Sequence, residues 1–150
     1  DEIGHGAGAG FTVNLPLAAG AVSEDFEVAF TDVVLPVLRQ FEPDLLMISA
    51  GFDAHADDPL GGLRLTTEVF GAMTMALRGI AEECCRGRVV AVTEGGYDLV
   101  ALAECSNLVI ETLEARASEP AWPSSGIPST RGRIAVEEVR PSLRPYWSLP

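Results

Sequence analysis

The fold is decided by residues 45–62, which read LLMISAGFDAHADDPLGG. The apolar run at the start gives way to small residues, then to a carboxylate and an imidazole, and the stretch ends in proline and glycine. This pattern is typical of a buried strand whose C-terminal end opens into a functional loop. Ligand sites of open α/β sheets lie at that end of the strands. Because three carboxylates and one histidine fall within residues 53–58, a metal or cation site is a reasonable hypothesis.

The segments on either side alternate between helical and strand patterns. Apolar residues recur at helical spacing over 26–41, 70–84 and 99–113, whereas residues 45–49 and 88–93 form short apolar runs. Ser23 is placed to cap the first helix, and Pro36 should kink that helix or divide it. The order helix, strand, helix, strand, helix is expected of a parallel sheet covered on both faces. The predicted fold class is therefore α/β.

Two further segments lie outside this alternation. Residues 4–10 are rich in glycine, but no strand precedes them and an extended segment ending at Pro16 follows, which argues against a dinucleotide-binding loop. A mobile loop leading into an edge strand at 11–16 is the better interpretation. Residues 118–132 are rich in proline, serine and glycine and predict a surface linker. A terminal helix around 134–140 should then lead into aromatic residues that dock back on the body.

Length and composition narrow the class of protein. With 150 residues, 47% of them hydrophobic, the chain can form one domain, or part of one, with a real core. The net charge of -12 disfavours nucleic acid as a partner and would attract cationic ligands, although most acidic proteins are acidic for solubility alone.

The cysteine spacing and the N-terminal residues indicate the cellular compartment in which the protein is expected. Cys84 and Cys85 are adjacent and Cys105 is distant, which makes neither a disulfide framework nor a metal knuckle and favours reduced thiols in the cytoplasm. The chain shows no leader pattern and no apolar stretch of membrane-spanning length. Since it starts at Asp1 without an initiator methionine, we expect it to begin inside something longer.

Two short segments carry the candidate chemistry. On an extended backbone, residues two apart point the same way, so Asp53 and His55 can present an oxygen and a nitrogen to one metal ion. Alternatively, Asp53 caps a turn and His55 is an ordinary loop histidine. Residues 94–97, EGGY, should lie at the same sheet edge. There the glycines admit a ligand and the Tyr97 hydroxyl can donate to an oxyanion, or the segment is only a tight turn with Tyr97 at its rim.

Three motifs, in this order and spacing, resemble the zinc-dependent histone deacetylase superfamily, and within it the bacterial acetoin-utilisation deacetylases and acetylpolyamine amidohydrolases. They are residues 8–17 (GAGFTVNLPL), residues 49–60 and residues 94–97. The resemblance implies the arginase/deacetylase-type three-layer α/β fold with a mainly parallel sheet. This chain would be its C-terminal part, with the partial domain at 1–117, a linker at 118–132, and the terminal helix and aromatic tail at 133–150.

The resemblance also implies roles for individual residues. Asp53 matches a zinc-binding aspartate of the family, and Tyr97 matches the tyrosine that polarises the acyl carbonyl and hydrogen-bonds the oxyanion. His55 matches no zinc ligand and is assigned to the surroundings of the site or to loop structure. The positions that match the narrow substrate channel are Leu60, Gly95 and Gly96.

The function implied by the resemblance is hydrolysis of an acetamide, such as acetyl-lysine or an acetylpolyamine, with zinc as the cofactor. Family members take two more zinc ligands and a His-His base from upstream motifs that are not found here, so this chain alone is expected to be inactive. The alternative is a non-catalytic α/β interaction module that binds a second copy or a missing N-terminal half through an exposed apolar face. Nucleic acid and membranes are not expected as partners, and the expected location is the cytoplasm.

Overall fold

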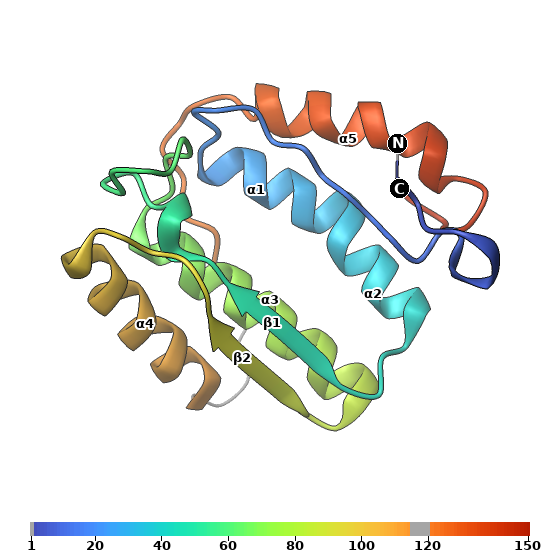
Figure 1. Ribbon diagram of the computed structural model, residues 1–150, viewed down its shortest axis with the longest axis horizontal. Helices are drawn as coiled ribbons and strands as arrows, with labels where there is room; N and C mark the ends of the chain where they lie inside the picture. The colour runs from blue at the N-terminus through green and yellow to red at the C-terminus, as the bar shows by residue number, and fades with distance from the viewer. Residues whose placement is uncertain (1, 115–120) are drawn as a thin grey trace.

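Two parallel strands form the sheet of the computed structural model, which describes residues 2–114 and 121–150. They are β1 (Leu46–Ala50) and β2 (Val89–Thr93), paired in register from Leu46 with Val89 to Ala50 with Thr93. Helix α3 (Thr67–Cys85) connects them and α4 (Leu99–Glu114) follows β2, as Figure 1 shows. Both strands begin within one residue of their predicted positions, and the parallel α/β prediction is confirmed.

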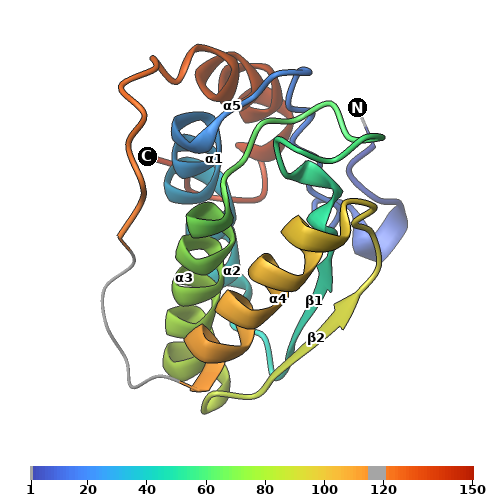
Figure 2. The ribbon, with the colours of Figure 1, turned by 90° about the vertical axis from the view of Figure 1, so that its left-hand side faces the viewer.

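Helices cover one face of this sheet within the described residues, rather than the two faces expected from the element order. Leu46 is buried against α3, where it packs with Ala81 and Cys85. Figure 2 shows α3 and α4 together on one side of the strands. On the other face Met47 is 68% exposed, and its pairing partner Val90 is exposed as well. A two-stranded sheet therefore presents an apolar surface to solvent.

A three-part helical rod lies beside β1. It consists of α1 (Ser23–Ala29), a π-helical turn η2 (Phe30–Val34) and α2 (Leu35–Phe41). The prediction that Pro36 divides this helix is confirmed, because the wide turn stands immediately before it. The predicted Ser23 cap is wrong: Val22 is the N-cap residue, and its N–H donates to the Asp25 carboxylate at 3.0 Å.

Helix α5 (Thr130–Leu143) packs on α1, as both ribbon views show (Figures 1 and 2). It begins four residues before the predicted position 134, so residues 130–132 of the expected 118–132 linker are helical. The reason is a long-range contact: the Gly132 N–H, in the first turn of α5, donates to the buried Asp25 carboxylate at 2.7 Å. A carboxylate is favoured at a helix N-terminus. The predicted start of the linker, at 118, lies outside the described residues.

The segment before α1 differs from the prediction. A 3₁₀ turn, η1 (Gly6–Gly8), opens it, and residues 11–16 form no strand within the described part of the chain. The predicted edge strand is therefore wrong. Val13 and Leu15 pack instead on the cluster that joins α1, α5 and the C-terminal tail.

The aromatic tail docks on the body as predicted. Trp147 is buried, and its Nε1–H donates to the Gly10 carbonyl at 2.7 Å. Within the described ranges, no helix combines the length and apolar character needed to cross a bilayer.

Candidate functional site

Two loops meet at the carboxyl edge of the sheet. Asp53 lies just past β1, in the 3₁₀ turn η3 (Phe52–Ala54). The pairing of the strands continues beyond their ends, because the Glu94 N–H donates to the Ala50 carbonyl at 3.1 Å and the Phe52 N–H donates to the Gly95 carbonyl at 2.8 Å. The structure thus brings together Asp53 and the EGGY segment at one sheet edge, as the sequence predicts.

The Asp53 carboxylate lies between two glycines. A Cβ at Gly95 would stand 2.8 Å from Asp53 Cγ and from both of its carboxylate oxygens, and a Cβ at Gly51 would stand 2.8 Å from Oδ1. Such distances are shorter than real Cβ contacts, so a side chain at either position would have to displace the carboxylate. Among the described residues, Asp53 has no side-chain hydrogen bond or ion pair. The two glycines therefore leave space for the Asp53 carboxylate, and no described side chain neutralises its charge.

Gly96 has a backbone reason to be glycine. Its φ of +133° lies in the region that other residues rarely adopt, and a Cβ there would stand 3.0 Å from Phe52 Cβ. Gly95 and Gly96 together let the loop after β2 pass directly against the loop after β1. This packing is established by the geometry, whereas their predicted place in a substrate channel stays a prediction.

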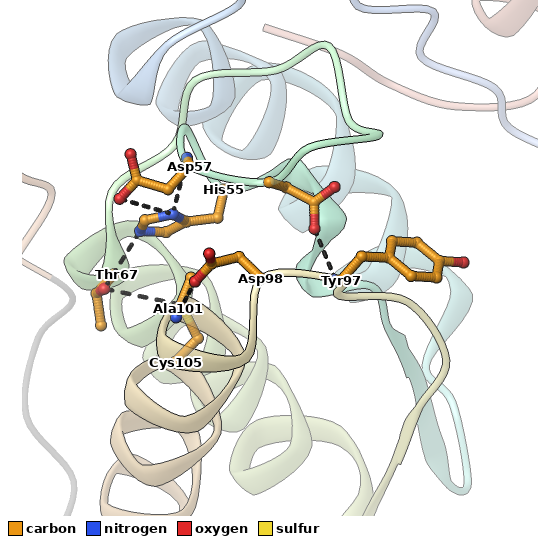
Figure 3. Close-up of polar contacts among 8 residues, drawn as sticks. His55, Asp57, Thr67, Tyr97, Asp98, Ala101 and Cys105 are labelled. Carbon is orange, nitrogen blue, oxygen red and sulfur yellow. Dashed lines mark hydrogen bonds and ion pairs between the residues drawn. The ribbon is translucent and has the colours of Figure 1, made fainter.

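The Asp58 carboxylate joins the same two loops. Its Oδ1 accepts the N–H groups of Leu60 and Gly61, each at 2.9 Å, and its Oδ2 accepts the Tyr97 N–H at 2.7 Å. Figure 3 shows the bond that reaches the Tyr97 backbone. Burial acts to raise the pKa of Asp58, but these N–H donors and that of Asp98 outweigh it and hold the pKa below its ordinary value.

Asp58 closes a local turn through its bonds to Leu60 and Gly61. Its bond to Tyr97, 39 residues away, is the part that sequence reasoning missed. No local pattern could have revealed it, because the contact depends on how the two strands pair.

The side chains of Tyr97 and Leu60 project outward. Tyr97 is 55% exposed and Leu60 is 72% exposed. In Figure 3 the Tyr97 ring points away from His55 and Asp98, and its hydroxyl has no hydrogen-bond partner among the described residues. The backbones of Tyr97 and Leu60 are held by opposite oxygens of one carboxylate, so the two side chains leave the surface from neighbouring points.

His55 is engaged by the protein at both ring nitrogens. Its Nδ1 accepts the Asp57 N–H at 3.2 Å, which leaves the proton on Nε2 to donate to Thr67 Oγ1 at 3.4 Å. The ring is buried and stacks on Phe70, with centroids 6.4 Å apart (Figure 3 shows the polar contacts). An Asp53–His55 chelating pair is not formed, because residues 52–54 turn as a 3₁₀ helix instead of staying extended.

The described residues supply only part of the ligand set that a zinc ion needs. A catalytic zinc site takes three protein ligands and keeps one position open. Within residues 2–114 and 121–150, no three His, Cys, Asp or Glu side chains are grouped to hold a metal ion. Asp53 is the candidate donor at this edge of the sheet, and the described residues by themselves do not make a zinc site.

Comparison with known proteins finds consistent similarity. Residues 1–113 match the family model of the histone deacetylase domain. The chain is 39% identical over 150 residues to the human polyamine deacetylase HDAC10, covering 98% of this chain and 21% of that protein. It is 41% identical over 113 residues to a histone deacetylase-like amidohydrolase of Pseudomonas aeruginosa, covering 75% of this chain and 30% of that protein.

Solved structures agree with this similarity. The histone deacetylase Clr3 superposes with a TM-score of 0.86 at 34% identity, over 97% of this chain and 24% of that chain. The HDA15 HD domain superposes with a TM-score of 0.82, also at 34% identity, over 97% of this chain and 38% of that chain. This chain therefore spans less than two fifths of each protein to which it is compared, and it corresponds to part of their domain.

Proposed function

Because the chain belongs to the histone deacetylase family, we propose that it is the part of a zinc-dependent deacetylase domain that supplies one zinc ligand and the oxyanion-stabilising tyrosine. The observation that carries this proposal is the pairing of an unneutralised Asp53 carboxylate with an exposed Tyr97 on adjoining loops. A carboxylate that is set between glycines and has no side-chain partner among residues 2–114 and 121–150 is suited to a cation. An exposed phenol on the adjoining loop is suited to a substrate carbonyl.

Each of the five site residues has a distinct part in this proposal. Zinc, when bound with its full set of ligands, polarises an acyl carbonyl and activates water. Asp53 would hold one coordination position. The Tyr97 hydroxyl would donate a hydrogen bond to the carbonyl oxygen as negative charge develops on it. Leu60, Gly95 and Gly96 would line the approach of the acyl group, with Leu60 as its apolar wall.

We propose an acetylated lysine or an acetylated polyamine as the substrate. Both carry cationic or amine-rich groups near the acetamide, and the chain's net charge of -12 favours the approach of such molecules. The human relative is named a polyamine deacetylase and the Pseudomonas relative an amidohydrolase, which suits either choice. Closer kinship with the bacterial acetoin-utilisation enzymes, and a cytoplasmic location, are further parts of the proposal.

The test is a deacetylase assay on the full-length gene product, with a fluorogenic acetyl-lysine peptide and an N-acetylpolyamine as separate substrates. Tyr97→Phe should lower kcat by about 100- to 1,000-fold, the usual cost of losing one oxyanion donor. Tyr146→Phe is the matched control, because Tyr146 lies in the C-terminal tail, and it should keep full activity. Activity that survives zinc chelation, or that survives Tyr97→Phe, would contradict the proposal.

A second hypothesis is an interaction module without catalysis. The observation in its favour is the apolar sheet face, where Met47, Val90 and Val92 are exposed. Light scattering on the 150-residue chain after size exclusion separates the two. A stable monomer without a partner would argue against the module, and so would deacetylation by the full-length protein. Aggregation of the isolated chain would favour a simple part of a catalytic domain.

A further inference from the structure

One buried carboxylate connects the two loops on which the proposed chemistry depends. The loop after β1 carries Asp53, and the loop after β2 carries Tyr97. We infer that Asp58 is a positioning residue that fixes the Tyr97 backbone relative to Asp53, an inference that rests on the proposed function for its catalytic consequence.

On the Asp53 side the link passes through Gly61. Asp58 Oδ1 accepts the N–H groups of Leu60 and Gly61, which closes a tight turn. That turn packs directly on Asp53, since a Cβ at Gly61 would stand only 1.7 Å from the Asp53 carbonyl oxygen. The Asp58 carboxylate is therefore linked to Asp53 indirectly, through the Gly61 backbone that packs on the Asp53 carbonyl.

On the Tyr97 side the link is direct. Asp58 Oδ2 accepts the Tyr97 N–H at 2.7 Å, the short distance expected of a hydrogen bond to a charged acceptor. This is the one hydrogen bond that Tyr97 makes among the described residues, and its ring is exposed. Asp98 follows and accepts the Ala101 N–H at 2.8 Å, which ties the next residue to the start of α4. Tyr97 is thus held between Asp58 and α4, as Figure 3 shows.

Accurate placement matters for this reaction class. A hydroxyl that must meet a developing oxyanion loses its effect when it is displaced by a fraction of a hydrogen-bond length. Because more than half of the Tyr97 side chain is exposed to solvent, the position of its Cα largely decides where the hydroxyl can reach. The carboxylate of Asp58 is the group that sets that position.

Asp58→Asn tests the inference, with Asp57→Asn as the matched control. An asparagine side chain has one acceptor oxygen, which can keep the turn at Leu60 and Gly61, and it turns an NH₂ group toward the Tyr97 N–H. The turn at Leu60 and Gly61 can therefore persist, whereas the contact with Tyr97 would place two hydrogen-bond donors, the amide NH₂ and the Tyr97 N–H, against each other. Asp57 is the neighbouring residue, and its side chain is 78% exposed, so the same change there removes no contact with Tyr97.

The first measurement is amide hydrogen exchange in the full-length protein. In Asp58→Asn the Tyr97 amide should exchange at least about 10-fold faster, because a buried charged acceptor is lost. The Gly61 amide should keep its protection, and Asp57→Asn should change neither. Unchanged exchange at Tyr97 would overturn the inference. This measurement does not need activity, so it stands even if the proposed deacetylase function fails.

The second measurement is a double-mutant cycle on kcat and KM. Asp58→Asn should lower kcat by about 10- to 100-fold with KM nearly unchanged, as expected when a reacting group is misplaced. In a Tyr97→Phe background the same change should cost little, because no hydroxyl remains to be positioned. An equal loss in both backgrounds would show that Asp58 acts on the fold alone and would overturn the positioning role.

Discussion

Replacing Asp25 with alanine should cost about 3–6 kcal/mol of unfolding free energy, because it removes two hydrogen bonds to a buried charge at about 1.5–3 kcal/mol each. Asp25 is fully buried, and its two oxygens accept the N–H groups of Val22 and Gly132 at 3.0 and 2.7 Å. These donors stand at the N-termini of α1 and α5. One side chain therefore serves its own helix and a second helix, whose donor Gly132 lies 107 residues further along the chain. The alanine variant would leave both donors buried without an acceptor.

The assay is urea denaturation of the full-length protein, followed by far-ultraviolet circular dichroism. Asp25→Asn should lose about half as much as Asp25→Ala, because one amide oxygen can accept one of the two bonds. Asp44→Ala is the control, since that carboxylate is fully exposed and its contact with Arg88 is 3.8 Å long, and it should leave stability unchanged. A loss below about 1 kcal/mol for Asp25→Ala would refute the bridging role, because even one such bond is worth more.

Three further predictions follow from the same structure. Gly95→Ala places a methyl group 2.8 Å from the Asp53 carboxylate and should lower both zinc content and kcat/KM of the full-length protein, whereas Gly79→Ala, with nothing within 4 Å, should not. Hydrogen bonds from the Thr66 hydroxyl and from the backbone N–H of Glu68 itself hold the pKa of the Glu68 carboxyl below its ordinary 4.5. The stability that ionised Glu68 contributes is therefore present at neutral pH and is lost as the pH falls below about 4.5. Glu68→Gln should flatten the dependence of Tm on pH in that range, and an unchanged slope would contradict this. Finally, burial raises the pKa of both Cys84 and Cys105, so access decides which thiol reacts first. Iodoacetamide should modify half-buried Cys84 before buried Cys105, as mass spectrometry of the native and denatured chain can check.

Most of the fold is predictable because its elements carry strong periodic patterns. Helix α3 ends at Cys85, one residue after the periodic pattern over 70–84, and Arg86 and Gly87 follow with positive φ. The strands are found within one residue because short apolar runs between helices leave few alternatives. The predicted edge strand at 11–16 is wrong, because Val13 and Leu15 pack against helices instead of joining a sheet.

The parts that sequence could not supply all depend on contacts between distant residues. The start of α5 follows from Asp25, and the connection of the two site loops follows from Asp58, neither of which has a local signature. The proximity of Asp53 to Gly95 was predictable, since parallel strands end at one edge. The lack of a described hydrogen-bond partner for the Asp53 carboxylate was not predictable, because it depends on which side chains reach that carboxylate in the folded chain.

The π-helical turn at Phe30–Val34 accommodates one extra residue within the helical rod. A π turn holds one residue more than an α turn, and each residue advances a helix by about 100°. Because the π turn takes up the extra residue, α1 and α2 keep the faces of one continuous helix, and Leu38 stays in the cluster that it shares with α3. Deleting one residue within 30–34 should therefore restore an α turn and leave α2 in place, whereas a deletion inside α2 would rotate the residues after it by about 100°. In an alignment of relatives, a one-residue gap at 30–34 would signal the loss of the π turn rather than a repacked helix.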